Sequence, residues 1–232
     1  MIADNLAAVR ARIDAAASRV GRDAREITLV AVTKEVDAPA AREAVANGAG
    51  DLGENRAQEL AKKREALAGV EVRWHMIGTV QKNKVAQVVG EVALIHSVDS
   101  VSLGQAVGRR AEARNLRQDV LLEVNVGGES SKHGVRPAEA IEVAEGLLDI
   151  EGVKLRGLMT VAPQGDGAVA RAAFRALREL RDKVRATAPE VIELSMGMTE
   201  DFEIAIEEGA TIVRIGTAIF GPRRTKQTGP RK

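Results

Sequence analysis

A lysine near the N-terminus is the residue best placed for covalent chemistry. Lys34 follows a short, apolar and β-branched segment at residues 27–33 (ITLVAVT), a pattern typical of a buried strand. Burial disfavours an ammonium ion and lowers the pKa of a lysine, and the neutral amine can attack an aldehyde to form an imine. The strand alone favours a simpler interpretation, in which Lys34 merely ends the strand and extends its ammonium group into water.

Two segments near the C-terminus carry small and hydroxyl residues that suit an anion. Ser195 follows an apolar segment at residues 191–194, and Gly216 and Thr217 lie at the end of another at residues 211–215. Backbone N–H groups bind phosphate, and glycine allows the anion to come close. The glycine is equally well explained as a turn residue, and the chain has no GxGxxG or P-loop pattern.

Other kinds of chemistry have less support. The chain has no cysteine, which excludes disulfides, thiolate metal sites and a cysteine nucleophile. His75, His96 and His133 lack the paired spacing of metal ligands, so we interpret them as structural and predict no metal site. Ser195 is not part of a GxSxG motif, which argues against a hydrolase nucleophile.

Short apolar segments alternate with amphipathic segments along almost the whole chain. The strand candidates are residues 27–33, 50–52, 72–77, 92–98, 120–126, 153–159, 191–194 and 211–215. Helical segments, one of them at residues 81–89, separate most of these, and an amphipathic helix precedes them all. This alternation predicts an α/β fold, a single (β/α)8 TIM-type barrel over residues 1–232 with an extra N-terminal helix. An open doubly wound sheet is the alternative, because the second strand candidate is short.

In such a barrel, functional groups gather at the carboxyl ends of the strands. Lys34, Ser195 and Gly216 each lie at or just beyond the end of a predicted strand. We therefore expect these residues at one rim of the barrel.

Composition restricts the possible partners. The 232 residues include 34 basic and 33 acidic side chains, so charge gives no reason to expect nucleic acid or an anionic membrane as a partner. The N-terminal segment lacks the continuous apolar stretch of a signal peptide, and no stretch approaches the ~20 apolar residues that span a bilayer. We predict a cytoplasmic monomer with a flexible basic tail at residues 222–232.

Seven motifs, spread over nearly the whole chain, carry a family resemblance. They are AVTKEV (31–36), LGENRAQEL (52–60), WHMIGTVQKNK (74–84), HSVDS (96–100), VNVGGESSKHG (124–134), GLMTVAP (157–163) and LSMGMTEDFEIAIEEGATIVRIGTAIFG (194–221). In these motifs the sequence resembles the pyridoxal phosphate homeostasis protein family, which is similar in turn to the N-terminal barrel of alanine racemase.

The resemblance implies that pyridoxal 5′-phosphate (PLP) is the cofactor, held as a Schiff base on Lys34. It implies that Asn55 lines the cofactor pocket and that Arg214 faces the pyridine nitrogen. The positions that match the phosphate site are Ser195, Gly216 and Thr217. Lys132 matches a family lysine near the pocket mouth, where it is a candidate second site of aldehyde capture. Met196 is expected to line the pocket, with core packing an equal alternative.

The resemblance also separates a carrier from an enzyme. An arginine stays protonated and leaves the pyridine nitrogen unprotonated, which weakens PLP as an electron sink. The racemases that the chain resembles use the same arrangement, so the arginine alone does not rule out racemisation, and the stronger discriminator is an absence. Alanine racemase chemistry uses a tyrosine as second base, supplied with a separate C-terminal domain, whereas this chain has no tyrosine and ends just after the eighth strand. We therefore expect a protein that takes part in PLP homeostasis, buffering the cofactor or delivering it to PLP-requiring apoenzymes, without appreciable turnover. A racemase-like PLP enzyme and a phosphate-binding barrel that does not use PLP are the alternatives.

Overall fold

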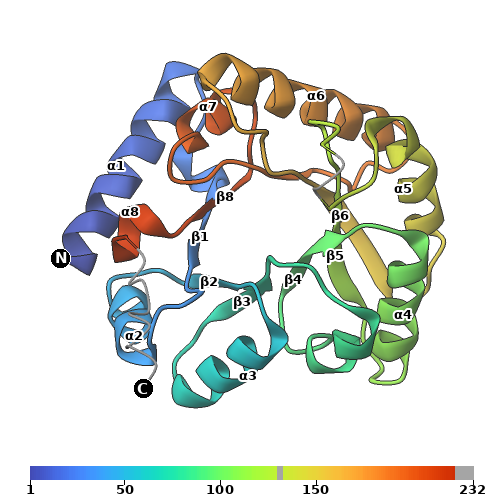
Figure 1. Ribbon diagram of the computed structural model, residues 1–232, viewed down its shortest axis with the longest axis horizontal. Helices are drawn as coiled ribbons and strands as arrows, with labels where there is room; N and C mark the ends of the chain where they lie inside the picture. The colour runs from blue at the N-terminus through green and yellow to red at the C-terminus, as the bar shows by residue number, and fades with distance from the viewer. Residues whose placement is uncertain (130–132, 223–232) are drawn as a thin grey trace, which may run out of the picture.

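Eight parallel strands close into a barrel in the order in which they occur along the chain. The computed structural model describes residues 1–129 and 133–222, and Figure 1 shows the strands inside a ring of helices. The strands are β1 (Thr28–Val32), β2 (Asp51–Glu54), β3 (Arg73–Met76), β4 (Leu94–Val98), β5 (Gln118–Glu123), β6 (Val153–Met159), β7 (Glu193–Ser195) and β8 (Ile212–Ile215). Pairing of β1 with β8 closes the barrel, so the open sheet is excluded.

Helices alternate with these strands and cover the outside of the barrel. They are α2 (Ala38–Ala46), α3 (Ala57–Ala66), α4 (Val101–Glu112), α5 (Ala140–Leu148), α6 (Gly167–Arg185), α7 (Phe202–Glu207) and α8 (Thr217–Phe220). The short 3-10 helices are η1 (Ala24–Glu26), η2 (Lys82–Gln87) and η3 (Pro137–Glu139). Helix α1 (Ile2–Arg19) precedes β1 and lies against α7 and α8 (Figure 1). The predicted barrel with an extra N-terminal helix is confirmed.

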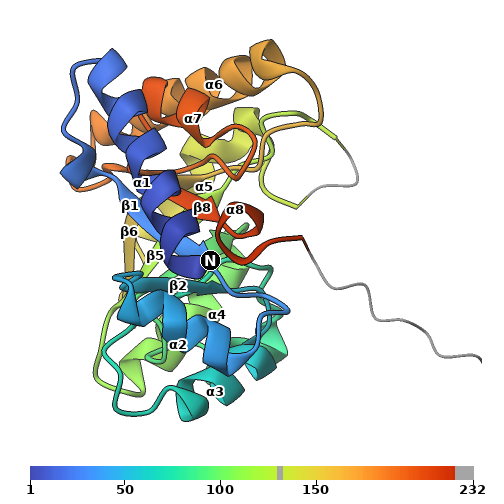
Figure 2. The same cartoon turned by 90° about the vertical axis from the view of Figure 1, so that its left-hand side faces the viewer.

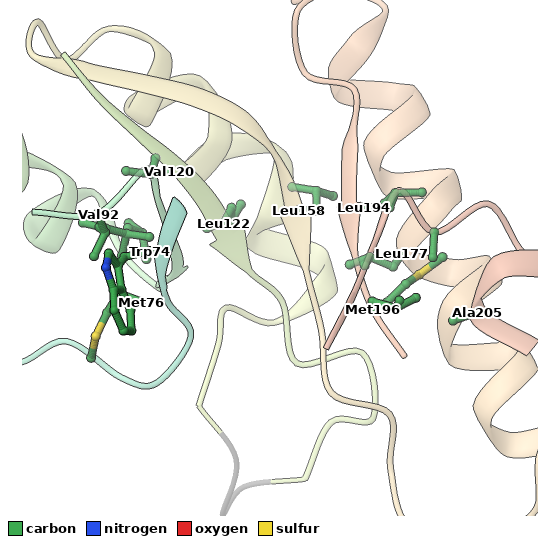
Figure 3. Close-up of a cluster of buried hydrophobic side chains, with 14 of the residues drawn as sticks. Trp74, Met76, Val92, Val120, Leu122, Leu158, Leu177, Leu194, Met196 and Ala205 are labelled. Atoms are coloured by element: carbon green, nitrogen blue, oxygen red, sulfur yellow. The ribbon is translucent and has the colours of Figure 1, made fainter. Parts of the chain in front are cut away.

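The hydrophobic core has two layers, because successive side chains of a strand point to opposite faces of the sheet. The inner layer fills the barrel and consists of Val30, Leu94, Leu121, Met159 and Ile212. The outer layer lies between the strands and the helices, and Figure 3 shows part of it, including Leu122, Leu158 and Leu194. This arrangement leaves the carboxyl ends of the strands as the open rim of the barrel.

The rim carries α8 at the end of β8, as the side view in Figure 2 shows. The amide of Asn5 on α1 donates a hydrogen bond to the Ile219 carbonyl oxygen of α8 at 2.9 Å, so the N-terminal helix supports this part of the rim. No helix among the described residues is both long enough and apolar enough to cross a membrane. Of the predicted basic tail, residues 223–232 lie outside the described part of the chain.

Candidate functional site

A cavity of about 350 Å³ lies at the carboxyl ends of β1 and β8. Lys34, Gly216 and Thr217 line it together with Val32 and with residues of α1, α2 and α8. Lys34 is half-buried and lines the cavity, so its side chain lies at the rim. The structure therefore brings together the predicted lysine and two of the residues predicted at the phosphate.

Lys34 lies in a tight turn between β1 and α2. The next residue, Glu35, has a φ of 62°, a left-handed conformation that is uncommon outside glycine. The Val36 amide donates to the Thr33 carbonyl oxygen at 3.0 Å, and Asp37 caps the first turn of α2. This turn leads the backbone from β1 into α2 and leaves Lys34 in the lining of the cavity.

A buried ion pair holds the residue that precedes Lys34. The Glu54 side chain is fully buried and the Lys63 side chain is 10% exposed. The Lys63 ammonium donates to the Glu54 carboxylate and to the Thr33 carbonyl oxygen, and the Thr33 hydroxyl donates to the same carboxylate. Charged groups from β2 and α3 therefore fix the end of β1 from outside the barrel.

The loop after β8 passes close to β1. A Cβ atom on Gly216 would lie 3.3 Å from the Val32 carbonyl oxygen, closer than an ordinary van der Waals contact, so glycine keeps this side of the cavity open. The Thr199 hydroxyl lies beside the same loop and accepts a hydrogen bond from the Ala218 amide at 3.4 Å. Sequence reasoning missed Thr199, although it is a hydroxyl residue only four positions beyond Ser195.

Arg214 and Ser195 lie deeper, inside the barrel. Arg214 donates from Nη1 to Ser195 Oγ at 2.5 Å and from Nη2 to the Thr160 carbonyl oxygen at 2.9 Å. Burial lowers the pKa of Arg214 to about 10, and the carboxylates of Glu123 and Asp201 oppose that shift. The guanidinium group therefore remains a cation at neutral pH.

Glu123, at the end of β5, is a second residue that sequence reasoning missed. Burial raises its pKa to about 6, the Asp99 carboxylate adds to the rise, and His133 and Arg214 oppose it. Its Oε2 atom is buried and has no hydrogen-bond partner among the described residues. A single acid inside the apolar segment VLLEVNV was the available signal. A carboxyl group that ionises near neutral pH thus lies close to the Arg214 cation.

Two of the histidines lie inside the barrel and contact each other. His75 Nδ1 and His96 Nε2 are 2.9 Å apart. Burial lowers the pKa of His96 well below its ordinary value, and the nearby His75 and Arg214 add to the shift, so His96 is neutral. Within residues 1–129 and 133–222, no group of three or more His, Cys, Asp or Glu side chains is arranged to hold a metal ion.

The three remaining predicted site residues are Asn55, Lys132 and Met196, and none of them lines the first cavity among the described residues. Asn55 lines a neighbouring cavity of about 460 Å³ at the same rim, together with Lys84 and His133. Lys132 lies outside the described residues. Met196 is fully buried in the outer core layer.

Figure 3 shows the Met196 side chain beside Leu177 of α6 and Ala205. Ser195 uses the inward position at the end of β7, so the next side chain points outward to the helices. The Met196 side chain therefore packs in the core, which is the alternative that the sequence also allowed.

Comparisons with known proteins agree in family and fold. The family "Alanine racemase, N-terminal domain" matches residues 5–224. The "Pyridoxal phosphate homeostasis protein" of Aquifex aeolicus is 46% identical over 95% of this chain and 98% of its own length. The protein of the same name from Pseudomonas aeruginosa is 43% identical over 96% of each chain.

Solved structures show the same architecture. PipY of Synechococcus elongatus, solved with PLP bound, is 34% identical, with a TM-score of 0.84 over 95% of this chain and 100% of its own. An unknown protein from Bifidobacterium adolescentis is 42% identical, with a TM-score of 0.90 over 94% of each chain. Alanine racemase of Clostridium difficile is 16% identical with a TM-score of 0.75, over 96% of this chain and 58% of the racemase, a likeness of fold alone.

Proposed function

Because the chain belongs to the pyridoxal phosphate homeostasis protein family, which its motifs already indicated, we propose that it binds PLP covalently through Lys34. It buffers the cofactor in the cytoplasm or delivers it to PLP-requiring apoenzymes, without appreciable turnover. One observation carries the proposal: the Lys34 amine shares a cavity with Gly216 and Thr217, and these two follow the strand that bears the buried Arg214 cation.

The residues present fit the cofactor. PLP supplies an aldehyde that condenses with an amine, and Lys34 offers a half-buried amine at the rim. Gly216 and Thr217, with the Thr199 hydroxyl beside them, offer a close approach for the phosphate. The cation of Arg214, two residues before Gly216, suits the pyridine nitrogen as a donor.

Arg214 limits the electron sink that PLP can provide, and the absence of tyrosine gives the stronger support for a carrier. A group with a pKa of about 10 keeps its proton at neutral pH and does not transfer it to the ring nitrogen. PLP with an unprotonated ring nitrogen is a weaker electron sink for carbanion chemistry. The sequence also contains no tyrosine that could act as a second base for racemisation.

Borohydride trapping tests the covalent attachment. The purified protein should show a visible absorption band with PLP, and reduction should leave the label on the peptide that contains Lys34. Lys34→Ala should lose the trapped label while retaining its melting temperature. Lys84→Ala, which removes a lysine of the neighbouring cavity, is the matched control and should retain it. Label that stays in Lys34→Ala at the wild-type level would overturn the attachment.

Turnover is tested separately. Loaded protein incubated with L-alanine and other amino acids should leave their chirality unchanged. Racemisation that depends on Lys34 would show that the protein is a racemase-like enzyme and not a carrier. Transfer of PLP to an apoenzyme, followed by the recovered activity of that apoenzyme, tests delivery.

A further inference from the structure

A continuous chain of hydrogen bonds runs through the interior of the barrel. Arg214 Nη1 contacts Ser195 Oγ at 2.5 Å, and Ser195 Oγ contacts His96 Nδ1 at 2.8 Å. His96 Nε2 contacts His75 Nδ1 at 2.9 Å, and His75 Nε2 contacts Asp51 Oδ1 at 2.8 Å. The five residues come from β8, β7, β4, β3 and β2, so the chain crosses the barrel interior from β8 and β7 to β4 and then returns through β3 to β2.

The two ends decide which atom donates in every link. Arg214 has only donors, and an ionised Asp51 has only acceptors. With one hydrogen in each link, the Ser195 hydroxyl accepts from Arg214 and donates to His96. Each neutral histidine then carries its hydrogen on Nε2 and accepts at Nδ1, and the last hydrogen goes to Asp51.

Burial supports this assignment. His96 and Ser195 are 0% exposed and His75 is 1% exposed, so unpaired hydrogen-bonding atoms at these positions would be costly. The lowered pKa of His96 agrees with its neutral state. The Ser195 hydrogen is already used by His96, so Ser195 contacts Arg214 as an acceptor.

At its Asp51 end the hydrogen-bond chain lies near charged groups from several strands. Arg73 lies 3.6 Å from the Asp51 carboxylate. A small cavity of about 100 Å³ beside His75 is also lined by Asp119, Arg156 and Glu193.

We propose that Asp51, His75 and His96 are positioning residues that hold the Arg214 guanidinium, through Ser195, in the orientation required by the PLP ring. The proposal rests on the proposed function in one respect, the contact between Arg214 and PLP. A second bond, from Arg214 to the Thr160 carbonyl oxygen, fixes the other end of the guanidinium group. Loss of the chain leaves one of these two anchors, and the cation can then rotate.

The hydrogen positions are tested without PLP. Long-range ¹H–¹⁵N correlation spectra of the ¹⁵N-labelled apoprotein at pH 7 should show His75 and His96 as neutral rings protonated on Nε2. In His75→Leu the His96 Nε2 hydrogen loses its acceptor while Nδ1 still accepts from Ser195, so His96 should keep its tautomer and its Nε2 resonances should shift. A doubly protonated His75, or a His96 that already carries its hydrogen on Nδ1 in the wild type, would overturn the chain.

Binding tests the positioning role. His75→Leu should weaken PLP binding about tenfold and shift the visible band, because a hydrogen-bond network to a charged group is interrupted. Asp51→Asn keeps a carbonyl acceptor for His75 and should retain most of the wild-type affinity. Leu121→Ala removes apolar volume from the inner layer at a position whose sheet partner is Gly157 and not a residue of the hydrogen-bond chain, so it should lower stability but keep the PLP affinity and spectrum.

The two failures are distinguishable. If His75→Leu binds PLP like the wild type while the spectra show the expected tautomers, the positioning role is wrong and the binding site stands. If the wild type traps no PLP at Lys34, the proposed function fails. The histidine tautomers of the apoprotein then still show whether the hydrogen-bond chain from Arg214 to Asp51 is present.

Discussion

The ion pair behind the Lys34 turn allows a stability change to be predicted from the structure. Lys63→Met removes the ammonium group that donates to the Glu54 carboxylate and the Thr33 carbonyl oxygen. The Glu54 side chain is fully buried, and after the substitution the Thr33 hydroxyl is its remaining partner among the described residues. A buried carboxylate without a counter-charge is one of the few single changes that cost several kcal/mol.

The expected size follows from the burial of both partners. Removing one member of a buried pair costs about 3–5 kcal/mol, and each kcal/mol lowers the melting temperature of a chain of this length by about 2–4 °C. Lys63→Met should therefore melt about 6–20 °C below the wild type. Replacing both partners, as in Glu54→Leu with Lys63→Met, removes the unpaired charge and should bring the stability within about 2 kcal/mol of the wild type.

Urea unfolding and calorimetry of the wild type, Glu54→Leu, Lys63→Met and the double variant measure the coupling between the two positions. Lys62→Met, which removes the neighbouring exposed lysine of α3, is the matched control and should change stability by no more than about 0.5 kcal/mol. The reasoning is refuted if Lys63→Met costs less than about 1 kcal/mol. It is equally refuted if the double variant loses the sum of the two single losses, since the pair would then have no coupling energy.

Two further predictions concern the rim. Glu123 has a pKa raised to about 6 in the folded state, so the folded protein binds the extra proton and stability should fall by about 2 kcal/mol in total as pH rises from about 4 to about 7. Urea titrations between pH 4 and 7 should show Glu123→Gln without this fall, and parallel curves for the two proteins would contradict it. Gly216→Ala should weaken PLP binding about tenfold by placing a methyl group near Val32, whereas Gly50→Ala, where an added Cβ meets no atom within 4 Å, should bind PLP normally. Equal affinities of the two alanine variants, measured by absorption titration, would remove Gly216 from the site.

The sequence was sufficient for the barrel because buried parallel strands are apolar on both faces and stand out from the helices. Its boundaries were less accurate where polar residues lie inside strands. The predicted second strand covered residues 50–52, whereas β2 extends to Glu54, since the carboxylate is paired with Lys63 of α3. The segment at residues 81–89 forms a 3-10 helix from 82 to 87. A local hydrophobicity pattern reveals neither the Lys63 partner of Glu54 nor the type of helix that a segment forms.

The site was predictable only in part for a related reason. Lys34, Gly216 and Thr217 follow strand ends, so a rule about barrel rims brings them together, and the structure shows them in one cavity. His75 and His96 were interpreted as structural because they are 21 residues apart and match no metal spacing. They become neighbours because adjacent strands β3 and β4 both point these side chains inward. Such a contact depends on register, which hydrophobicity alone does not determine.

Strand β2 connects the two polar networks around the proposed cofactor site. Its four residues place Asp51 on the inner face, where it ends the chain that reaches Arg214, and Glu54 on the outer face, where it fixes the residue before Lys34. Alternation along the strand makes this division possible, since positions 51 and 54 are an odd number of residues apart. A slip of one residue in the pairing of β2 would exchange the two faces and disrupt both networks at once. The positions of Lys34 and Arg214 therefore depend on the register of one short strand. Variants that remove the acceptor at position 51 or the carboxylate at position 54 should affect PLP binding, although neither side chain lines the Lys34 cavity.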